Sequence, residues 1–349
     1  MNLVTVAFAL LAGLLIVYAI LDGFDLGVGV LSMLARSREE RDLHYAAVGP
    51  VWDGNEVWLL ASGNVLFGAF PLAFAVVCNG LYLALMLLLL ALTARAVAIE
   101  FRRHPTSARW VAGCDAAFAL GSLVPVLLYG VVAGNVLRGV PIGPGFAWHC
   151  SLRELLNPYA LLVGLASCAL FMTHGALFLR VNREGELSER FGRIALAAHA
   201  AFVVLFGAAF AATAWVSPSF FRKAGSPIAW ALALALILAL ATVPAATRRG
   251  KARLAFLASC AAIALLIATA ALATYPVLLP SSLMPEHSLT VYNAASTPGT
   301  LAAILAIACV GLPIVVGYTA LVYRAFSGGQ RSAPPPVDEQ DAAESLVEP

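Results

Sequence analysis

Charged residues are scarce in this chain. Asp, Glu, Lys and Arg make up 11% of its 349 residues, whereas an average soluble domain carries about 25%. Hydrophobic residues make up 61%, far more than a disordered protein contains. The 21 Lys and Arg nearly balance the 19 Asp and Glu, so there is no excess of basic charge to bind a nucleic acid. These shortages exclude a soluble globular enzyme, a disordered protein and a nucleic-acid binder, and leave an integral protein of the lipid bilayer.

Residues that bind metals or haem form no clear set. The six cysteines stand singly, without a C-x-x-C pair, so neither a zinc knuckle nor a disulfide framework is indicated. His174 and His199 each lie in a predicted membrane helix, where either could ligate a haem. They share no evident depth across two helices, so we interpret them as hydrogen-bonded core residues and expect no metal site in this chain.

Long apolar runs fill most of the sequence. A helix needs about 20 apolar residues to cross a bilayer, and the alternating strands of a barrel do not produce such unbroken runs. We expect an all-α polytopic membrane protein over residues 1–326, with nine transmembrane helices that fit two four-helix bundles plus one peripheral helix. Pro71 and the short gap at 78–80 leave eight helices as the alternative. The predicted helices are residues 3–22, 54–77, 79–99, 111–136, 155–179, 194–216, 227–245, 254–279 and 300–323.

The loops predict an orientation. The loops on one side carry 16 Lys and Arg residues and those on the other side carry 4, and cytoplasmic loops hold the excess of positive charge. The N-terminus is therefore expected outside and the C-terminus in the cytoplasm. Because the N-terminus lacks a basic segment, we interpret residues 3–22 as a retained span rather than a signal peptide. Residues 327–349, rich in Gly, Pro and acids, are expected to form a disordered cytoplasmic tail.

Acidic residues gather at one side of the predicted bundle. Six are expected at the cytoplasmic ends of the first four helices, whereas the later helices contain none. A charged side chain at the bilayer centre costs roughly 2.5–3.5 kcal/mol on insertion scales, so acids in membrane helices suggest a function. With Arg95, such a cluster could draw protons from the cytoplasm. The six acids are Asp22, Asp25, Asp53, Glu56, Glu100 and Asp115.

Helix capping is the alternative for some of these acids. Asp53 and Glu56 have the D-x-x-E spacing of a capping box, and the helix dipole favours acids at an N-terminus. Asp22 and Asp25 are expected at a helix C-terminus, where the dipole disfavours them. Capping therefore does not explain the second pair, for which solvation at the membrane interface stays open.

Two N-terminal motifs resemble subunit II of the cytochrome bd-type quinol oxidases. They are DGFDLGVG at residues 22–29 and PVWDGNEVWL at residues 50–59. The resemblance continues at Arg95, at LNP (156–158), and from YP (275–276) to PSS (280–282). It therefore touches nearly the whole chain.

The resemblance implies a subunit of a terminal oxidase in the bacterial cytoplasmic membrane. Such a complex oxidises quinol, reduces O2 to water and takes the chemical protons from the cytoplasm, which generates a membrane potential. In that family, haem b558, haem b595 and haem d belong to subunit I, so this chain is expected to ligate no cofactor and to have subunit I as its partner. Small single-helix accessory subunits and a bound quinone are left open.

The resemblance also assigns a proton path to acids of this chain. Asp53 matches the acid that passes protons toward the haem site at the subunit interface. Glu100 stands where the family can carry an acid at the cytoplasmic mouth of that path. The remaining motif acids, Asp22, Asp25 and Glu56, are expected on the same path.

Three further residues receive roles from the resemblance. Trp58 matches a tryptophan beside the lateral opening of an oxygen channel, and Trp52 precedes it in the same motif. Arg95 matches a buried arginine near the subunit interface.

A proton-coupled secondary transporter is the rival from another class, since it also uses a few intramembrane acids. The acids here are predicted at one face rather than at the midplane, and no broken helix pair marks a substrate site. A cytochrome in its own right, using His174 and His199, is the second rival. Haem absorbance in the isolated chain would support it.

Overall fold

The computed structural model describes residues 2–104, 107–148, 151–181, 183–223 and 225–326, so the predicted tail 327–349 lies outside the described residues. Within these ranges, eight helices are long and apolar enough to cross a membrane, and one bent helix pair could supply a ninth span. The prediction of an all-α polytopic membrane protein is confirmed.

The eight long helices are α1 (Leu3–Leu31), α5 (Tyr82–Phe101), α6 (Ala108–Arg138), α8 (Pro158–Val181), α9 (Gly185–Val216), α10 (Pro227–Arg248), α11 (Ala252–Thr274) and α12 (Pro298–Phe326). The bent pair is α3 (Trp52–Ala69) and α4 (Pro71–Gly80). The short elements are α2 (Arg38–Val48), α7 (Leu152–Leu155), η1 (Ser32–Leu34), η2 (Pro144–Phe146), η3 (Pro218–Lys223), η4 (Pro285–His287), β1 (Val277–Leu279) and β2 (Leu289–Thr290).

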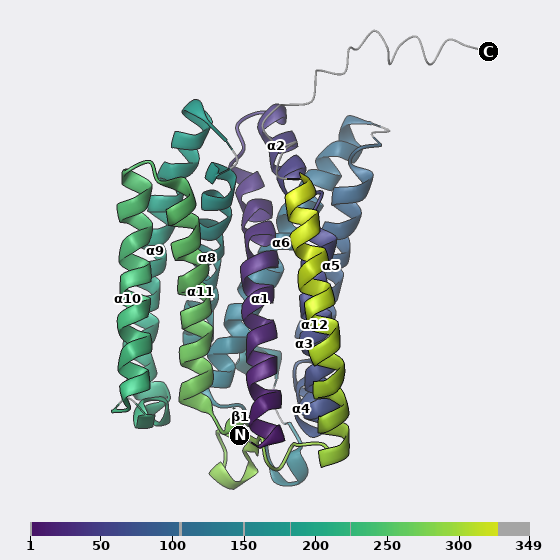
Figure 1. The fold of residues 1–349 in the computed structure, drawn as a ribbon, viewed down its shortest axis with the longest axis vertical. Helices are drawn as coiled ribbons and strands as arrows, with labels where there is room; N and C mark the ends of the chain where they lie inside the picture. The colour runs from purple at the N-terminus through teal and green to yellow at the C-terminus, as the bar shows by residue number, and fades with distance from the viewer. Residues whose placement is uncertain (1, 105–106, 149–150, 182, 224, 327–349) are drawn as a thin grey trace, which may run out of the picture.

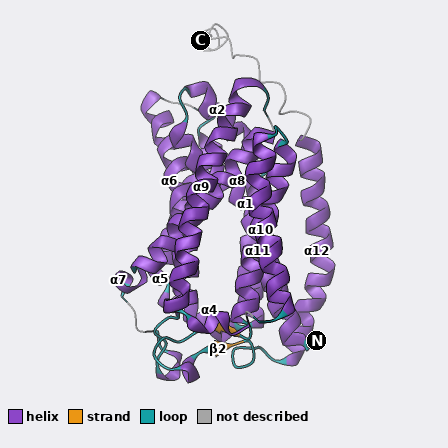
Figure 2. Ribbon diagram, turned by 90° about the vertical axis from the view of Figure 1, so that its left-hand side faces the viewer, coloured by secondary structure: helices purple, strands orange, loops and turns teal. Residues whose placement is uncertain are grey.

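The long helices run side by side between two ends of the molecule (Figure 1). We name these the α2 end, where α2 lies and α12 finishes, and the β1 end, where α1 begins and β1 pairs antiparallel with β2. Helices α9 to α11 lie on one side of α1, and α3, α5 and α12 lie on the other. Helix α12 stands at the edge of the bundle (Figure 2), packed against α3 and α1.

The first helix is longer than predicted. It continues past residue 22 to Leu31, so Asp22 and Asp25 lie inside α1 and do not close it. The extension is buried because α1 and α8 approach closely at two glycines. A Cβ on Gly175 would lie 2.6 Å from the carbonyl carbon of Gly27, and such contact between backbones requires residues without side chains.

The second predicted helix is broken. Helix α3 ends at Ala69, and α4 begins at Pro71 with its axis bent by 119°. Proline has no N–H to continue the preceding helix but fits the first position of a new one. The chain therefore contains one bent helix pair, at the position where Pro71 left the predicted boundary open. The pair carries no charged residue between Phe70 and Gly80.

The predicted helix 254–279 also ends early. Helix α11 stops at Thr274, and Val277–Leu279 form strand β1. Tyr275 leaves the helical region with a ψ of 135°, a value within the range favoured for a residue that precedes proline.

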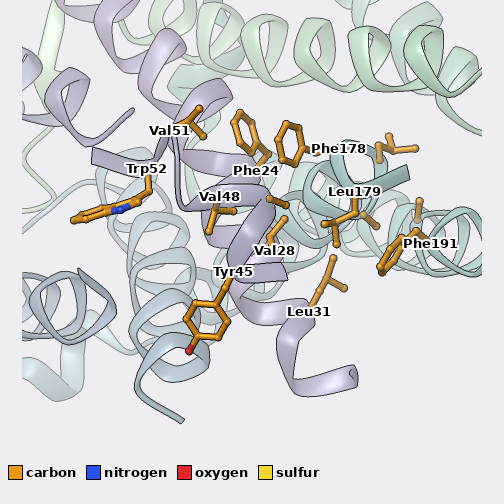
Figure 3. Packing of buried hydrophobic residues seen from close by; sticks show 14 of the residues in the cluster. Phe24, Val28, Leu31, Tyr45, Val48, Val51, Trp52, Phe178, Leu179 and Phe191 are labelled. Carbon is orange, nitrogen blue, oxygen red and sulfur yellow. The ribbon is translucent and has the colours of Figure 1, made fainter. Parts of the chain in front are cut away.

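An apolar core at the α2 end joins the two sides of the bundle. Phe24 and Val28 of α1 point toward Phe178 and Leu179 of α8 (Figure 3). The rings of Phe24 and Phe178 stack with their centroids 3.9 Å apart. This packing joins α1 to α8 beside the buried polar residues described next.

Candidate functional site

A buried ion cluster ties three helices together. Arg95 of α5 is fully buried, and its Nη2 donates to Oδ1 of Asp22 on α1 at 2.7 Å and to Oε1 of Glu56 on α3 at 2.8 Å. The Asp22 side chain is also fully buried, whereas that of Glu56 is 23% exposed. The cluster therefore reaches from the bundle interior to its surface through Glu56.

A second polar link begins one helical turn further along α1. Oδ2 of Asp25 accepts a hydrogen bond from Nδ2 of Asn55 at 2.7 Å. Oδ1 of Asn55 accepts in turn from the hydroxyl of Tyr323 on α12 at 3.1 Å. Asp25, Asn55 and Tyr323 thus connect the first helix to the last through α3.

Several atoms of these groups lack a hydrogen-bond partner among the described residues. They include Oδ2 of Asp22, Oδ1 of Asp25, and Nε and Nη1 of Arg95. Buried polar atoms are normally partnered by protein or by ordered water. The carboxyl oxygens among these atoms can each accept a further hydrogen bond, and Nε and Nη1 of Arg95 can each donate one.

A tyrosine pair lies on the β1 side of the cluster. The hydroxyls of Tyr18 and Tyr129 are 2.5 Å apart. Tyr18 precedes Asp22 by four residues, a spacing that places both on one face of α1. This spacing is the signal by which sequence reasoning could have found Tyr18. Asn55, Tyr129 and Tyr323 were missed as well.

Two of the predicted path residues stand apart from the buried cluster. Asp53 and Glu100 are exposed and have no hydrogen bond or ion pair with any described residue. Asp115 pairs elsewhere, with Nε of Arg102 at 2.6 Å and with Arg41 at 3.6 Å. The structure thus groups Asp22, Asp25, Glu56 and Arg95 and excludes the other three predicted acids.

Asp53 and Glu56 do not form a capping box. Helix α3 has Val51 at its N-cap with no side-chain hydrogen bond. Asp53 lies in the first turn, where the helix dipole favours a carboxylate, and Glu56 binds Arg95 instead of the backbone.

Asp53 and Glu100 belong to two outward stripes. Their members recur every three or four residues, which places each set on one helix face. Both stripes contain polar side chains among apolar ones, and a lipid-exposed face disfavours polar and ionisable groups. This mixture of polar and apolar side chains favours a protein partner over lipid along both stripes. The exposed residues are Asp53, Val57, Leu60, Asn64 and Phe67 on α3, and Met86, Leu90, Thr93, Val97 and Glu100 on α5.

The two motif tryptophans lie in different places. Trp58 is 3% exposed and packs in the cluster of the β1 side that includes Tyr18 and Val65, and its Nε1 has no described partner. Trp52 belongs to the core of the α2 end (Figure 3). Neither side chain is exposed on the surface of this chain.

The histidines of the membrane helices are hydrogen-bonded core residues. The ring nitrogens of His174 lie 2.8 Å from Oγ of Ser259 and 2.9 Å from the carbonyl oxygen of Ile20. Nε2 of His199 lies 3.0 Å from the carbonyl oxygen of Leu240. Pro244 frees this carbonyl, since it has no N–H to donate four residues on. Within the described ranges, no group of three or more His, Cys, Asp or Glu could hold a metal ion.

Helix α2 carries a second, separate set of charges outside the membrane helices. Burial would raise the pKa of Glu40, but hydrogen bonds from Arg190 and from the backbone N–H of Arg36 outweigh it and hold that pKa below its usual value. His44, one turn along, is buried against Phe191. Burial lowers the pKa of His44 to about 4, so this imidazole is neutral at physiological pH.

Comparisons with known proteins identify relatives of this chain. A family model for cytochrome bd terminal oxidase subunit II matches residues 3–326. The chain is 35% identical to the cytochrome bd-I ubiquinol oxidase subunit 2 of Escherichia coli, over 90% of this chain and 92% of that protein. It is 32% identical to the cytochrome bd ubiquinol oxidase subunit 2 of Bacillus subtilis, over 91% and 94%.

A solved structure has the same fold. The bd oxidase of Geobacillus thermodenitrificans contains a chain that matches with a TM-score of 0.74 and 19% identity, over 93% of this chain and 99% of that one. From the match of the family model over nearly its whole length, and from relatives above 30% identity, the chain belongs to the family of cytochrome bd terminal oxidase subunit II.

Proposed function

We propose that this chain is the subunit of a quinol-oxidising, O2-reducing complex that holds no haem and supplies protons from the cytoplasm to its partner. Family membership makes it part of an oxidase. The relatives from Escherichia coli and Bacillus subtilis are named as subunits of ubiquinol oxidases, which supports quinol as the electron donor.

The proposed partner is a haem-bearing subunit I that packs on the two outward stripes of α3 and α5. Asn64 and Thr93 lie in the middle of these stripes, where lipid would leave their polar groups without partners. A partner helix that brings donors and acceptors would satisfy them. The haems would supply the electron transfer and O2 chemistry from that subunit, and the bonded ring nitrogens of His174 fit a chain that ligates none of them.

The observation that carries the proton path is the graded burial of three acids. Asp53 is exposed, Glu56 one turn further along α3 is 23% exposed, and Asp22 is fully buried. Arg95 contacts the last two. One guanidinium thus faces two carboxyl groups. If one of these carboxyls bound a proton, the net charge of the three side chains would be zero. Asp53 would exchange protons with water and hand them toward the partner.

The same proposal assigns the α2 end to the cytoplasm. The arginine-rich loops lie at this end, and positive loops mark the cytoplasmic side. Glu100 on α5 would then stand at the cytoplasmic mouth of the path. The N-terminus lies outside in this arrangement.

The test uses the complex purified through a tag on this chain. Asp53→Asn should lower quinol-driven O2 consumption at least about tenfold, while the reduced-minus-oxidised haem spectrum stays that of the wild type. Glu189→Gln removes an exposed acid outside both stripes and should leave the rate unchanged. A wild-type rate for Asp53→Asn would overturn the proton path alone. Purification of this chain without a haem-bearing partner would overturn the subunit assignment.

A further inference from the structure

A groove between α10 and α11 opens at the α2 end. It has a volume of about 290 Å³. Its walls include Leu238, Ala241 and Ala245 of α10 and Leu254 of α11, and Arg249 and Lys251 stand beside it. The groove therefore combines an apolar wall with two cations at one end.

The turn between the two helices fixes the backbone of the residues that carry the cations. Gly250 adopts a φ of +72°, which permits the sharp reversal, and the N–H of Lys251 donates to the carbonyl oxygen of Ala246 at 3.0 Å. Along α10, the alanines at 241 and 245 are one turn apart and leave a depression on the helix surface.

The length of the groove matches one leaflet of a bilayer. The eleven helical steps from Leu238 to Arg249 correspond to about 16 Å at 1.5 Å per residue. Half of a hydrocarbon core is about 15 Å. With the arginine at the level of the headgroups, the apolar wall reaches the middle of the membrane.

The cations of this turn lack an acidic partner in the part of the chain that the structure describes. Arg248, Arg249, Lys251 and Arg253 lie within six residues, and none of them forms an ion pair with any residue that the structure describes. No Asp or Glu occurs in the sequence between Glu189 and Glu286. Their positive charge is thus available to an anion.

A second groove at the same end provides a contrast. Its volume is about 540 Å³, and it is lined by Arg38, Arg41 and Asp115 together with apolar residues of α6. Arg41 pairs with Asp115 at 3.6 Å, so part of the charge there is already neutralised. In the groove between α10 and α11, by contrast, neither Arg249 nor Lys251 has an anionic partner among the described residues.

We propose that the α10–α11 groove binds an anionic glycerophospholipid. The phosphodiester contacts Arg249 and Lys251, and one acyl chain lies along the wall of Leu238, Ala241 and Ala245. A free phosphate would leave the apolar wall unused, and a neutral quinone would leave the two cations without a counterion. This inference is independent of the proposed proton path.

The experiment measures lipid bound to the delipidated, detergent-purified complex by native mass spectrometry during titration with phosphatidylglycerol or phosphatidylcholine. The variant Arg249→Gln/Lys251→Gln should lose one tightly bound phosphatidylglycerol per complex, with its apparent affinity lowered at least fivefold. The matched control Arg248→Gln/Arg253→Gln removes the same charge from the same turn but does not line the groove, and it should bind as the wild type does. Phosphatidylcholine binding should be equal in all three proteins.

A third variant tests the apolar wall. Ala245→Phe fills the groove from the membrane-facing side of α10 and leaves both cations in place, so it should lose the same lipid. Equal loss in both charge variants would show a mere effect of net charge and overturn the site. Unchanged binding in the groove variant, or displacement of the lipid by millimolar inorganic phosphate, would overturn it as well.

Discussion

Asp22 on α1 and Arg95 on α5 form an ion pair of 2.7 Å in which neither side chain is exposed to solvent. Taking two charges out of water is costly, and the attraction between them repays this only while both are present. The pair therefore holds the two helices at a fixed distance, and loss of one member leaves an uncompensated charge in the bundle.

Arg95→Met should destabilise the chain by about 3–5 kcal/mol, because Asp22 and Glu56 lose their shared cation. The midpoint of thermal unfolding of the purified complex measures this change. Arg109→Met, which removes an exposed arginine, should have almost no effect. Adding Asp22→Asn and Glu56→Gln to Arg95→Met should recover part of the stability. Equal midpoints for the two single variants would contradict the buried-pair argument.

Asn55→Ala should loosen α12. It removes the amide that joins Asp25 to Tyr323 and leaves a buried acceptor unpaired, at a cost of about 1–3 kcal/mol. Hydrogen exchange of the α12 backbone should rise in this variant. Glu189→Gln, which changes an exposed side chain on α9 and outside both stripes, is the control. If both variants exchange alike, the link through Asn55 does not hold α12.

The stability of the α2 end should depend on pH. The pKa of His44 is about 4 in the folded chain and about 6.5 when unfolded. Between these values the unfolded chain binds a proton that the folded chain does not. The contribution of His44 to stability is therefore constant above pH ~6.5 and falls by about 3 kcal/mol in total as the pH drops from ~6.5 to ~4.

Glu40, Arg41, Arg183 and Arg190 surround this imidazole electrostatically. The lowered pKa of Glu40 affects stability at a lower pH than His44 does. Its stabilising effect is lost only as the pH falls below about 4.5. His44→Phe should abolish the dependence between pH ~6.5 and ~4.5, as followed by proteolysis of the α2 region at each pH. A variant with the same pH profile as the wild type would refute the role of His44.

Gly27→Ala should disturb the contact between α1 and α8, since the added methyl would clash with the carbonyl oxygen of Phe171. Overpacking of this kind costs about 1–3 kcal/mol. Gly63→Ala meets no atom within 4 Å and should be neutral or stabilise α3 by up to about 1 kcal/mol. The unfolding midpoint should therefore fall for Gly27→Ala and stay level or rise for Gly63→Ala. A shift of the same sign and size would contradict the contact.

Much of the fold could be predicted because membrane spans depend on local hydropathy. The end of α1 could not, because the helix beyond residue 22 is stabilised by contact with Gly175, which lies far away in the chain. Pro71 marks a possible break in the sequence, but the 119° change of direction depends on where α4 packs.

The candidate site could be predicted in part. The motif acids Asp22, Asp25 and Glu56 do meet Arg95 or its neighbours in one region. Asp53 and Glu100 were expected in the same cluster because the sequence shows only how far along a helix a residue lies, not which face is turned outward to a partner. Tyr323 escaped notice because 268 residues separate it from Asn55.

The hydrogen bond from Tyr323 to Asn55 also bears on the order in which the helices are synthesised. Helix α12 is synthesised later than all the other described helices. It nevertheless supplies the hydroxyl donor of a hydrogen-bond network that includes Asp25 on the first helix. Helix α3 is thus synthesised with Oδ1 of Asn55 as an acceptor whose donor, Tyr323, comes only with α12. Closure of this polar interior therefore requires α12, and a chain that stops before Pro298 would leave Oδ1 of Asn55 without the donor that Tyr323 supplies.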